Sequence, residues 1–253
     1  MTTFLFRYSL AVQYLTIFSP GLNGKGSGLD LARSVPWFPV VGLLLGGGLS
    51  LLYFGLVWIL PSDLADLTVI FVLIAVTRGR RLRGLVQWIQ PATRSEFSSP
   101  AKDEGWHGSL GPTQVFVLLA VLLLKFVSLD LINESVKPQA ILMMPLVSHW
   151  NMTFLVYAAR FFKRDYLDPG SFIRWVEGRD FFRATVVFIA FPFYVLKLKA
   201  LFVLFIMILF SLLYLKLCRA RNLGFDEDAL GASSEPCEIL FLMALQGLNF
   251  ASN

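Results

Sequence analysis

Runs of apolar residues long enough to cross a bilayer are the feature that most limits how this chain can fold. Residues 32–60 contain a single charged residue, and residues 115–132 contain two. A helix crosses the hydrocarbon core of a membrane with about 20 predominantly apolar residues. The whole chain is 56% hydrophobic and 15% charged, whereas about a quarter of the residues in a soluble protein are charged. The sequence therefore predicts a polytopic integral membrane protein.

The other apolar segments are shorter or include polar residues. They are residues 64–76, 139–159, 184–196, 200–217 and 239–250. Residues 4–18 include Arg7 and Gln13 among apolar neighbours, which favours a helix at the membrane interface. We expect an all-α fold in a single membrane domain over residues 1–253, a bundle of roughly six to seven transmembrane or half-membrane helices. The composition of residues 64–76 is compatible with either a full or a partial crossing.

Three long polar segments, rich in basic residues, separate the apolar ones. They are residues 77–111, 160–183 and 218–238. An even number of predicted spans separates each from the next, so they form one face. Basic residues gather in cytoplasmic loops, so we expect three cytoplasmic loops on a protein of the inner, cytoplasmic membrane. The same rule accounts for the formal net charge of +5. We therefore expect the lipid bilayer as a partner, and no nucleic acid.

The first long apolar run has a recognisable start and a small-residue face. Pro36 and Pro39 precede or open the expected helix, where a missing N–H costs least. Four glycines follow, at positions 42, 46, 47 and 48. Glycines on one face of a membrane helix let a neighbouring helix approach closely. This segment is therefore predicted to pack tightly against another span.

The densest group of acidic residues lies before the last apolar segment. It comprises Asp226, Glu227, Asp228, Glu235 and Glu238. Glu235 and Glu238 would share a helical face, with Asp228 on the same side if the helix extends back that far; Pro236 is expected to break it. Carboxylates converging at a membrane interface suit Mg²⁺. The alternative is a solvated loop whose acidic residues favour a helix N-terminus.

Basic and polar residues elsewhere are further candidates for a site. The start of the 77–111 segment reads RGRRLRG from Arg78, and its guanidinium groups could clamp phosphates or simply set the topology. His107 lies near an interface, and its role is either catalytic or structural. His149 and Asn151 lie within a predicted span, where a polar side chain indicates either function or an interhelical hydrogen bond.

The order of these motifs resembles that of the cobalamin synthases, also called adenosylcobinamide-GDP ribazoletransferases. The resemblance rests on ARSVPWFPVVGLLLGG near the N-terminus, on Ser148 and on YAAR at residues 157–160. It rests also on the end of the chain, where that family has Gly-Asp-x-x-Gly-Ala followed by two glutamates three apart. Here the corresponding residues are Glu227-Asp228-Ala-Leu-Gly231-Ala232, with Glu235 and Glu238.

The resemblance implies a reaction, a cofactor and a set of site residues. These enzymes join adenosylcobinamide-GDP to α-ribazole or its phosphate and release GMP, with Mg²⁺. By this analogy Asp228, Glu235 and Glu238 are the expected catalytic and metal-binding residues. The expected substrate-binding residues are Arg81, Arg83, His107, Ser109 and Arg160. The partners implied are corrinoid and nucleotide substrates, with a homo-oligomer or other membrane proteins of the cobalamin pathway also compatible.

One family motif is matched in position but not in chemistry. The family has His-x-Asp-Gly-x-x-Asp-x-x-Asp where this chain has Arg81, Arg83, Gln87 and Gln90 at the His and three Asp positions. A later motif, Asp-Ser-Arg-x-Gly, falls on residues 107–111. Arg83 cannot ligate Mg²⁺ and would repel it. The magnesium implied by the family is therefore at odds with this part of the sequence.

Three functional hypotheses follow. The first is an active but divergent ribazoletransferase in which arginines replace part of the metal's charge. The second is a catalytically inactive family member that binds a corrinoid or nucleotide, or serves as an assembly subunit in the membrane. The third is a transporter, because Lys125, His149 and Asn151 lie within predicted spans.

Overall fold

The computed structural model describes residues 2–20, 26–89, 111–161, 171–220 and 226–250. Across these ranges the chain is helical, and no strand occurs within them. The α-helices are α1 (Thr2–Leu15), α2 (Gly28–Ala32), α3 (Phe38–Leu56), α4 (Ser62–Val76), α5 (Arg80–Ile89), α6 (Pro112–Asp130), α7 (Lys137–Ala159), α8 (Gly178–Leu196), α9 (Lys199–Ala220) and α10 (Glu227–Phe250), with 3₁₀ turns η1 (Val35–Trp37) and η3 (Phe172–Trp175). The predicted all-α membrane bundle is confirmed.

Four helical stretches in the described part of the chain are long and apolar enough to cross a membrane. They are Gly28–Leu56, Pro112–Asp130, Lys137–Ala159 and Lys199–Ala220. The 15-residue α4 is shorter than a full span. The expected number of roughly six to seven transmembrane or half-membrane helices stays a prediction.

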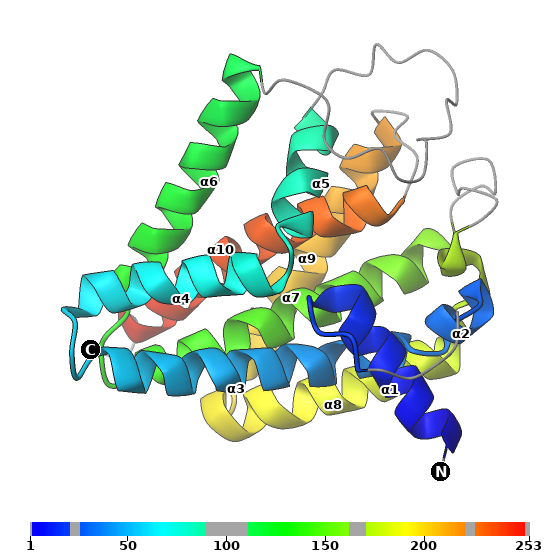
Figure 1. Ribbon diagram of the computed structural model, residues 1–253, viewed down its shortest axis with the longest axis horizontal. Coiled ribbons are helices and arrows are strands. Elements are labelled where there is room, and N and C mark those ends of the chain that lie inside the picture. Colours follow the sequence, from blue (N-terminus) through cyan, green and yellow to red (C-terminus); the bar gives the residue numbers. More distant parts are fainter. Residues whose placement is uncertain (1, 21–25, 90–110, 162–170, 221–225, 251–253) are drawn as a thin grey trace.

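The core of the bundle forms around α7, which is buried along most of its length. α3 lies against α7 in Figure 1. A Cβ atom at Gly46 would lie 1.9 Å from the Leu142 carbonyl oxygen, and one at Gly42 would lie 2.6 Å from that of Pro145. The predicted close approach is confirmed at these two glycines. At Gly47 and Gly48 it is wrong, because an added Cβ would meet nothing within 4 Å.

Two of the expected loops contain helix in their described parts. Residues 80–89 of the 77–111 segment form α5, because Arg81, Gly84 and Leu85 are spaced to bury one face. In the 218–238 segment, α9 continues to Ala220 and α10 begins at Glu227, passing through Pro236 without the expected break. Packing of α10 against its neighbours outweighs the lost proline hydrogen bond.

The 160–183 segment also differs in part from the expected loop. It contains the turn η3 and the first residues of α8, which begins at Gly178 rather than near residue 184. Residues 90–110, 162–170 and 221–225 lie outside the described residues.

The bundle has two unlike ends. The short connections after α3 and after α6 lie together at one end, on the left in Figure 1. There Lys137 Nζ is 2.7 Å from Asp66 Oδ2, and Tyr53 donates a hydrogen bond to Glu134. The start of α5 and the first turns of α10 lie away from that end and line one pocket. That the three long polar segments form one face stays a prediction. Which end faces the cytoplasm stays a prediction.

Candidate functional site

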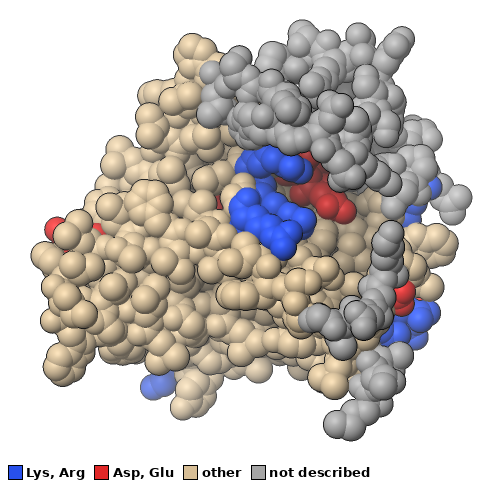
Figure 2. Space-filling model, viewed as in Figure 1, with Lys and Arg blue, Asp and Glu red and all other residues tan. Residues whose placement is uncertain are grey.

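A pocket of about 150 Å³ opens where α1, α5, α7 and α10 meet. Its lining residues are Tyr14, Leu15, Thr77, Arg80, Arg81, Arg83, His149, Met152, Glu227, Asp228, Leu230 and Gly231. Figure 2 shows basic and acidic side chains side by side in the middle of a face that otherwise carries few charges. Charge on this face of the described protein is thus concentrated at the pocket.

A close helix crossing sets the position of the arginines. A Cβ atom at Gly84 on α5 would lie 2.3 Å from the Asp228 carbonyl oxygen on α10, so only glycine allows this approach. Beyond the crossing, the Trp88 ring stacks on Tyr214 at 5.6 Å between centroids. α5 follows a turn in which Arg78 and Gly79 are left-handed, with φ of 57° and 61°. The turn and the crossing together fix α5 beside the pocket.

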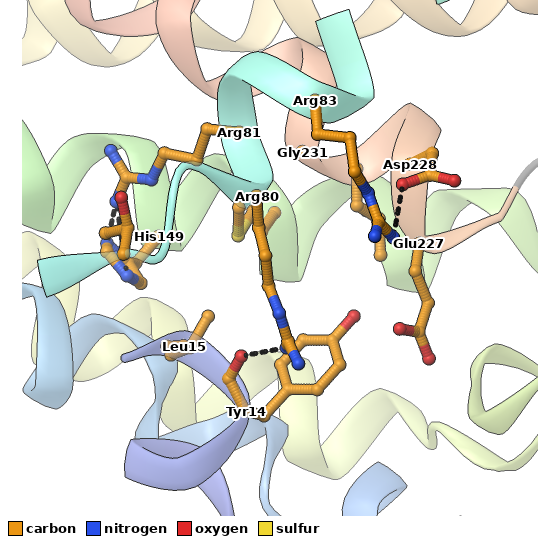
Figure 3. Close-up of a pocket in the computed structure, with 12 residues that line it drawn as sticks. Tyr14, Leu15, Arg80, Arg81, Arg83, His149, Glu227, Asp228 and Gly231 are labelled. Atoms are coloured by element: carbon orange, nitrogen blue, oxygen red, sulfur yellow. Dashed lines mark hydrogen bonds and ion pairs between the residues drawn. The ribbon is translucent and has the colours of Figure 1, made fainter. Parts of the chain in front are cut away.

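At the rim, Arg83 points to Asp228 and Arg80 points to Tyr14 (Figure 3). Arg80 donates a 2.8 Å hydrogen bond to the Tyr14 carbonyl oxygen. Arg83 Nη2 lies 3.6 Å from Asp228 Oδ1, and the Arg83 side chain is 55% exposed. An exposed ion pair contributes about 0–1 kcal/mol. Arg83 can therefore exchange Asp228 for an anionic ligand at little cost.

The acidic side of the rim is partly withdrawn from water. Burial raises the pKa of Glu227, and the nearby Arg80 offsets part of that rise. Burial also raises the pKa of Asp226, whose Oδ1 accepts a 2.8 Å hydrogen bond from the Ala229 amide. The pKa of the Tyr14 hydroxyl is raised by burial first and by Glu227 second. The pocket thus carries fixed positive charge on one side and titratable carboxylates on the other.

Beneath the rim lies a fully buried ionic cluster, defined here as Arg81, Lys125, Glu235 and Glu238. Lys125 Nζ is 2.7 Å from Glu235 Oε2 and 2.5 Å from Glu238 Oε2. Arg81 pairs with the other oxygen of Glu238. Ser148 donates a 2.7 Å hydrogen bond to that same oxygen. The cluster has two positive and two negative groups, so it is charge-balanced.

His149 lies between this cluster and the pocket. Its Nδ1 is 2.6 Å from the Pro145 carbonyl oxygen, to which it donates. Nε2 is then the unprotonated nitrogen, and it lies 3.4 Å from Arg81 Nη2. Asn151, the other polar residue of this span, hydrogen-bonds to Ser211 and Ser233. His149 therefore contributes to the pocket, whereas Asn151 joins helices.

The structure brings together some of the predicted site residues and separates others. Arg81, Arg83 and Asp228 line the pocket. Arg160 does not: it donates to the Val176 carbonyl oxygen and lies over the rings of Tyr157 and Phe161. Three further residues, Gln90, His107 and Ser109, lie outside the described residues.

Several residues at the site were not singled out from the sequence. Tyr14 belongs to a segment expected only to lie at the interface, and nothing in the sequence placed it beside α5. Glu227 was seen as one acidic residue among five. Lys125 was noted only as a charge within a span; that isolated charge was the available signal, because such a lysine needs a buried acidic partner.

The described residues do not fit a magnesium centre. Asp228 lies at the rim, while Glu235 lies seven residues further along α10, about 10 Å along the helix axis. Glu235 and Glu238 are already paired with Lys125 and Arg81. Nor do three His, Cys, Asp or Glu side chains converge as metal ligands anywhere in the described ranges.

Comparison with known proteins places the chain beside one group of enzymes. The family model described as Cobalamin-5-phosphate synthase matches residues 7–246. An adenosylcobinamide-GDP ribazoletransferase from Thermoanaerobacter pseudethanolicus is 25% identical over 239 residues, covering 94% of this chain and 95% of the relative. Proteins of the same name from Clostridium botulinum and Geotalea daltonii are 28% and 29% identical, covering 97% and 94% of this chain and 99% and 96% of their own. No solved structure matches.

Proposed function

Because the chain belongs to the cobalamin-5-phosphate synthase family, we propose that it is a membrane-bound ribazoletransferase of cobalamin biosynthesis. In this proposal it joins adenosylcobinamide-GDP to α-ribazole or its phosphate and releases GMP. The full-length match and the name shared by the curated relatives support the reaction class. The proposed location is the inner membrane, with the pocket open to the cytoplasm, where the nucleotide substrate is found.

The observation that carries the proposal is the set of three arginines on α5 at one pocket. Arg80 and Arg83 reach the rim, and Arg81 lies beneath them. Guanidinium groups bind phosphate oxygens through paired N–H donors. A volume of about 150 Å³ suits a diphosphate, since pockets that hold a whole drug-sized ligand measure about 300–1,000 Å³. The corrin ring would therefore lie outside this pocket.

The proposed chemistry is displacement at the diphosphate that links cobinamide to guanosine. The acceptor hydroxyl of α-ribazole forms a new P–O bond to the phosphorus that carries cobinamide, the P–O bond to GMP breaks, and the hydroxyl proton passes to solvent. Phosphoryl transfer depends mainly on alignment and on neutralising the oxygens of the transferred group. Arg80 and Arg83 would supply that neutralisation from the rim, with Arg81 behind them.

A second candidate function is ligand binding without turnover. It is favoured by the cation–carboxylate pairing in the buried ionic cluster and by Arg83 and Gln87 at Asp228. With its nitrogen turned toward Asp228, the Gln87 amide lies 3.1 Å from Oδ1. These contacts occupy the carboxylates that would otherwise hold a metal. Such a protein would bind a corrinoid or a nucleotide as a subunit of a larger membrane assembly, or as a homo-oligomer.

One assay distinguishes the two candidates. The protein in lipid nanodiscs is given adenosylcobinamide-GDP with α-ribazole or α-ribazole phosphate, and GMP release is measured together with substrate binding. We expect GMP release by the wild type, and about tenfold weaker binding for Arg80→Gln, which corresponds to about 1.4 kcal/mol. Arg219→Gln, on the exposed last turn of α9, is the matched control and should behave as the wild type.

The outcomes separate cleanly. Binding without GMP release selects the second candidate. Release that Arg80→Gln and Arg219→Gln reduce equally would show that the pocket arginines are not the phosphate site. Neither binding nor release would reject both candidates.

A further inference from the structure

Two buried carboxylates in the core of the bundle need a cation. Glu235 and Glu238 are one turn apart on α10, with exposed fractions of 1% and 0%. Adjacent buried carboxylates cannot both stay ionised unless positive charge lies between or beside them. In many enzymes such a pair would hold a divalent metal ion. Here the contacts of Glu235 and Glu238 show which positive group neutralises them.

A lysine side chain occupies the bridging position. Lys125 extends from α6, and its Nζ contacts an oxygen of each glutamate, at 2.7 Å and 2.5 Å. The lysine is itself fully buried. These contacts leave the ammonium group between the two carboxylates, where a bridging cation would otherwise lie. On the opposite side, Arg81 and Ser148 take up the other oxygen of Glu238.

The charge count leaves no room for a further cation. Two carboxylates face one ammonium and one guanidinium group, so the cluster is already neutral. Bringing in a divalent ion would place excess positive charge among groups that water does not screen. His149 is no additional ligand, because its Nδ1 donates to Pro145 and its Nε2 faces Arg81. The contact geometry and the charge balance therefore both argue against a divalent ion in the wild-type cluster.

We propose that Lys125 is a resident cation that takes the place of a divalent metal between Glu235 and Glu238, so that the neighbouring pocket binds a diphosphate without metal. The role of the pocket rests on the function proposed above, whereas the exclusion of metal by Lys125 does not. Arg81 connects the two, since it pairs with Glu238 and also lines the pocket. Lys125 is a positioning residue in this scheme, because its contacts are to Glu235 and Glu238.

A purely structural role for Lys125 has to be distinguished from this one. The lysine also anchors α6, most of whose surface is exposed in the described protein. If anchoring were its only role, removing it would lower stability and leave metal binding unchanged. If it is the resident cation, removing it leaves two carboxylates with only one guanidinium group to neutralise them. A divalent ion should then bind.

The test uses Mn²⁺ as the probe and the full chain in nanodiscs of zwitterionic lipid. Bound and free Mn²⁺ are separated by the electron paramagnetic resonance signal of the hydrated ion, with empty nanodiscs as background. We expect no binding above background for the wild type and about one Mn²⁺ per chain for Lys125→Met, at least tenfold tighter than in the wild type. Lys125→Arg keeps the charge and should bind no more than the wild type.

A second arm measures GDP binding to the wild type in excess EDTA and in excess Mg²⁺. We expect the same affinity in both media. Wild-type binding of Mn²⁺, or a tenfold loss of GDP affinity in EDTA, would overturn the proposal, and neither measurement requires a variant to fold. Folded Lys125→Met that binds no Mn²⁺ would also overturn it. Absence of GDP binding in both media rejects the proposed function alone, since the Mn²⁺ arm still decides the role of Lys125.

Discussion

Two helix crossings in this protein both depend on a glycine at the contact, but they serve different purposes. At the crossing of α3 and α7, Gly46 lies against the Leu142 backbone in the middle of the bundle. At the crossing of α5 and α10, Gly84 lies against the Asp228 backbone next to the pocket. The first brings together two long apolar helices, while the second holds a ten-residue helix that carries arginines. Glycine packing therefore stabilises the core at one place and positions charge at the other.

The largest effect is expected from Gly46→Ala. The added methyl group would lie 1.9 Å from a carbonyl oxygen, and backbone cannot rotate away as a side chain can. We expect a loss of about 3 kcal/mol in the free energy of unfolding, at the upper end for overpacking. Thermal unfolding in nanodiscs measures it. An unchanged midpoint would mean that the two helices do not approach this closely.

Gly84→Ala should cost less stability but more function. Its added methyl group would lie 2.3 Å from the Asp228 carbonyl oxygen, in a helix of 10 residues rather than 19, so we expect a loss of about 2 kcal/mol. Because α5 must shift, Arg80 and Arg83 move away from the rim, and diphosphate binding should weaken about tenfold. Isothermal titration with GDP measures this. If Gly46→Ala weakened binding as strongly, the division between core and site would be wrong.

The acidic rim predicts a smaller dependence on pH. The pKa of Glu227 is raised in the folded protein, so this carboxylate becomes neutral as the pH falls through that raised value. The diphosphate of adenosylcobinamide-GDP is esterified at both ends and keeps its charge there. Its repulsion by Glu227 is lost, so binding should strengthen as the pH falls. By Coulomb's law, loss of a unit charge about 7 Å away in a water-like medium changes the dissociation constant about threefold.

Glu227→Gln isolates this group from its neighbours. Asp226 also has a pKa raised by burial, and Arg80, Arg83 and Asp228 line the same pocket. The variant should bind adenosylcobinamide-GDP at neutral pH as the wild type does at low pH, with a flatter profile. An equally steep profile would assign the titration to Asp226 instead.

The smallest effect is expected from Gly48→Ala, the matched control for Gly46→Ala. An added Cβ at Gly48 would meet nothing within 4 Å, and alanine has the higher helix propensity. We expect a change within about 0.5 kcal/mol, and toward greater stability. A loss as large as that of Gly46→Ala would show that the effect does not depend on the contact with Leu142.

Much of the first crossing could be predicted from the sequence, and little of the second. The run of apolar residues with Pro39 at its start and Gly46 on one face predicted a span that packs closely. Nothing comparable marked α5, because Arg81 occupies a buried position that a hydrophobic pattern would give to an apolar residue. Its burial depends on Glu238, 157 residues away, and such a contact has no local signal.

The candidate site shows the same limit. The acidic group on α10 and the arginines at the start of α5 were both visible as clusters of charge. Their pairing was not, since Lys125 meets Glu235 across 110 residues. Spacing along one helix shows which side chains share a face, but only the packing of several helices shows which charges neutralise one another.

The buried ionic cluster also constrains how the sequence can change. Each of Arg81, Lys125, Glu235 and Glu238 neutralises a charge held by another member. Replacing any one alone would leave an uncompensated charge within the bundle. A change at one of these positions therefore calls for a compensating charge in the cluster, supplied either by a second substitution or by a bound cation.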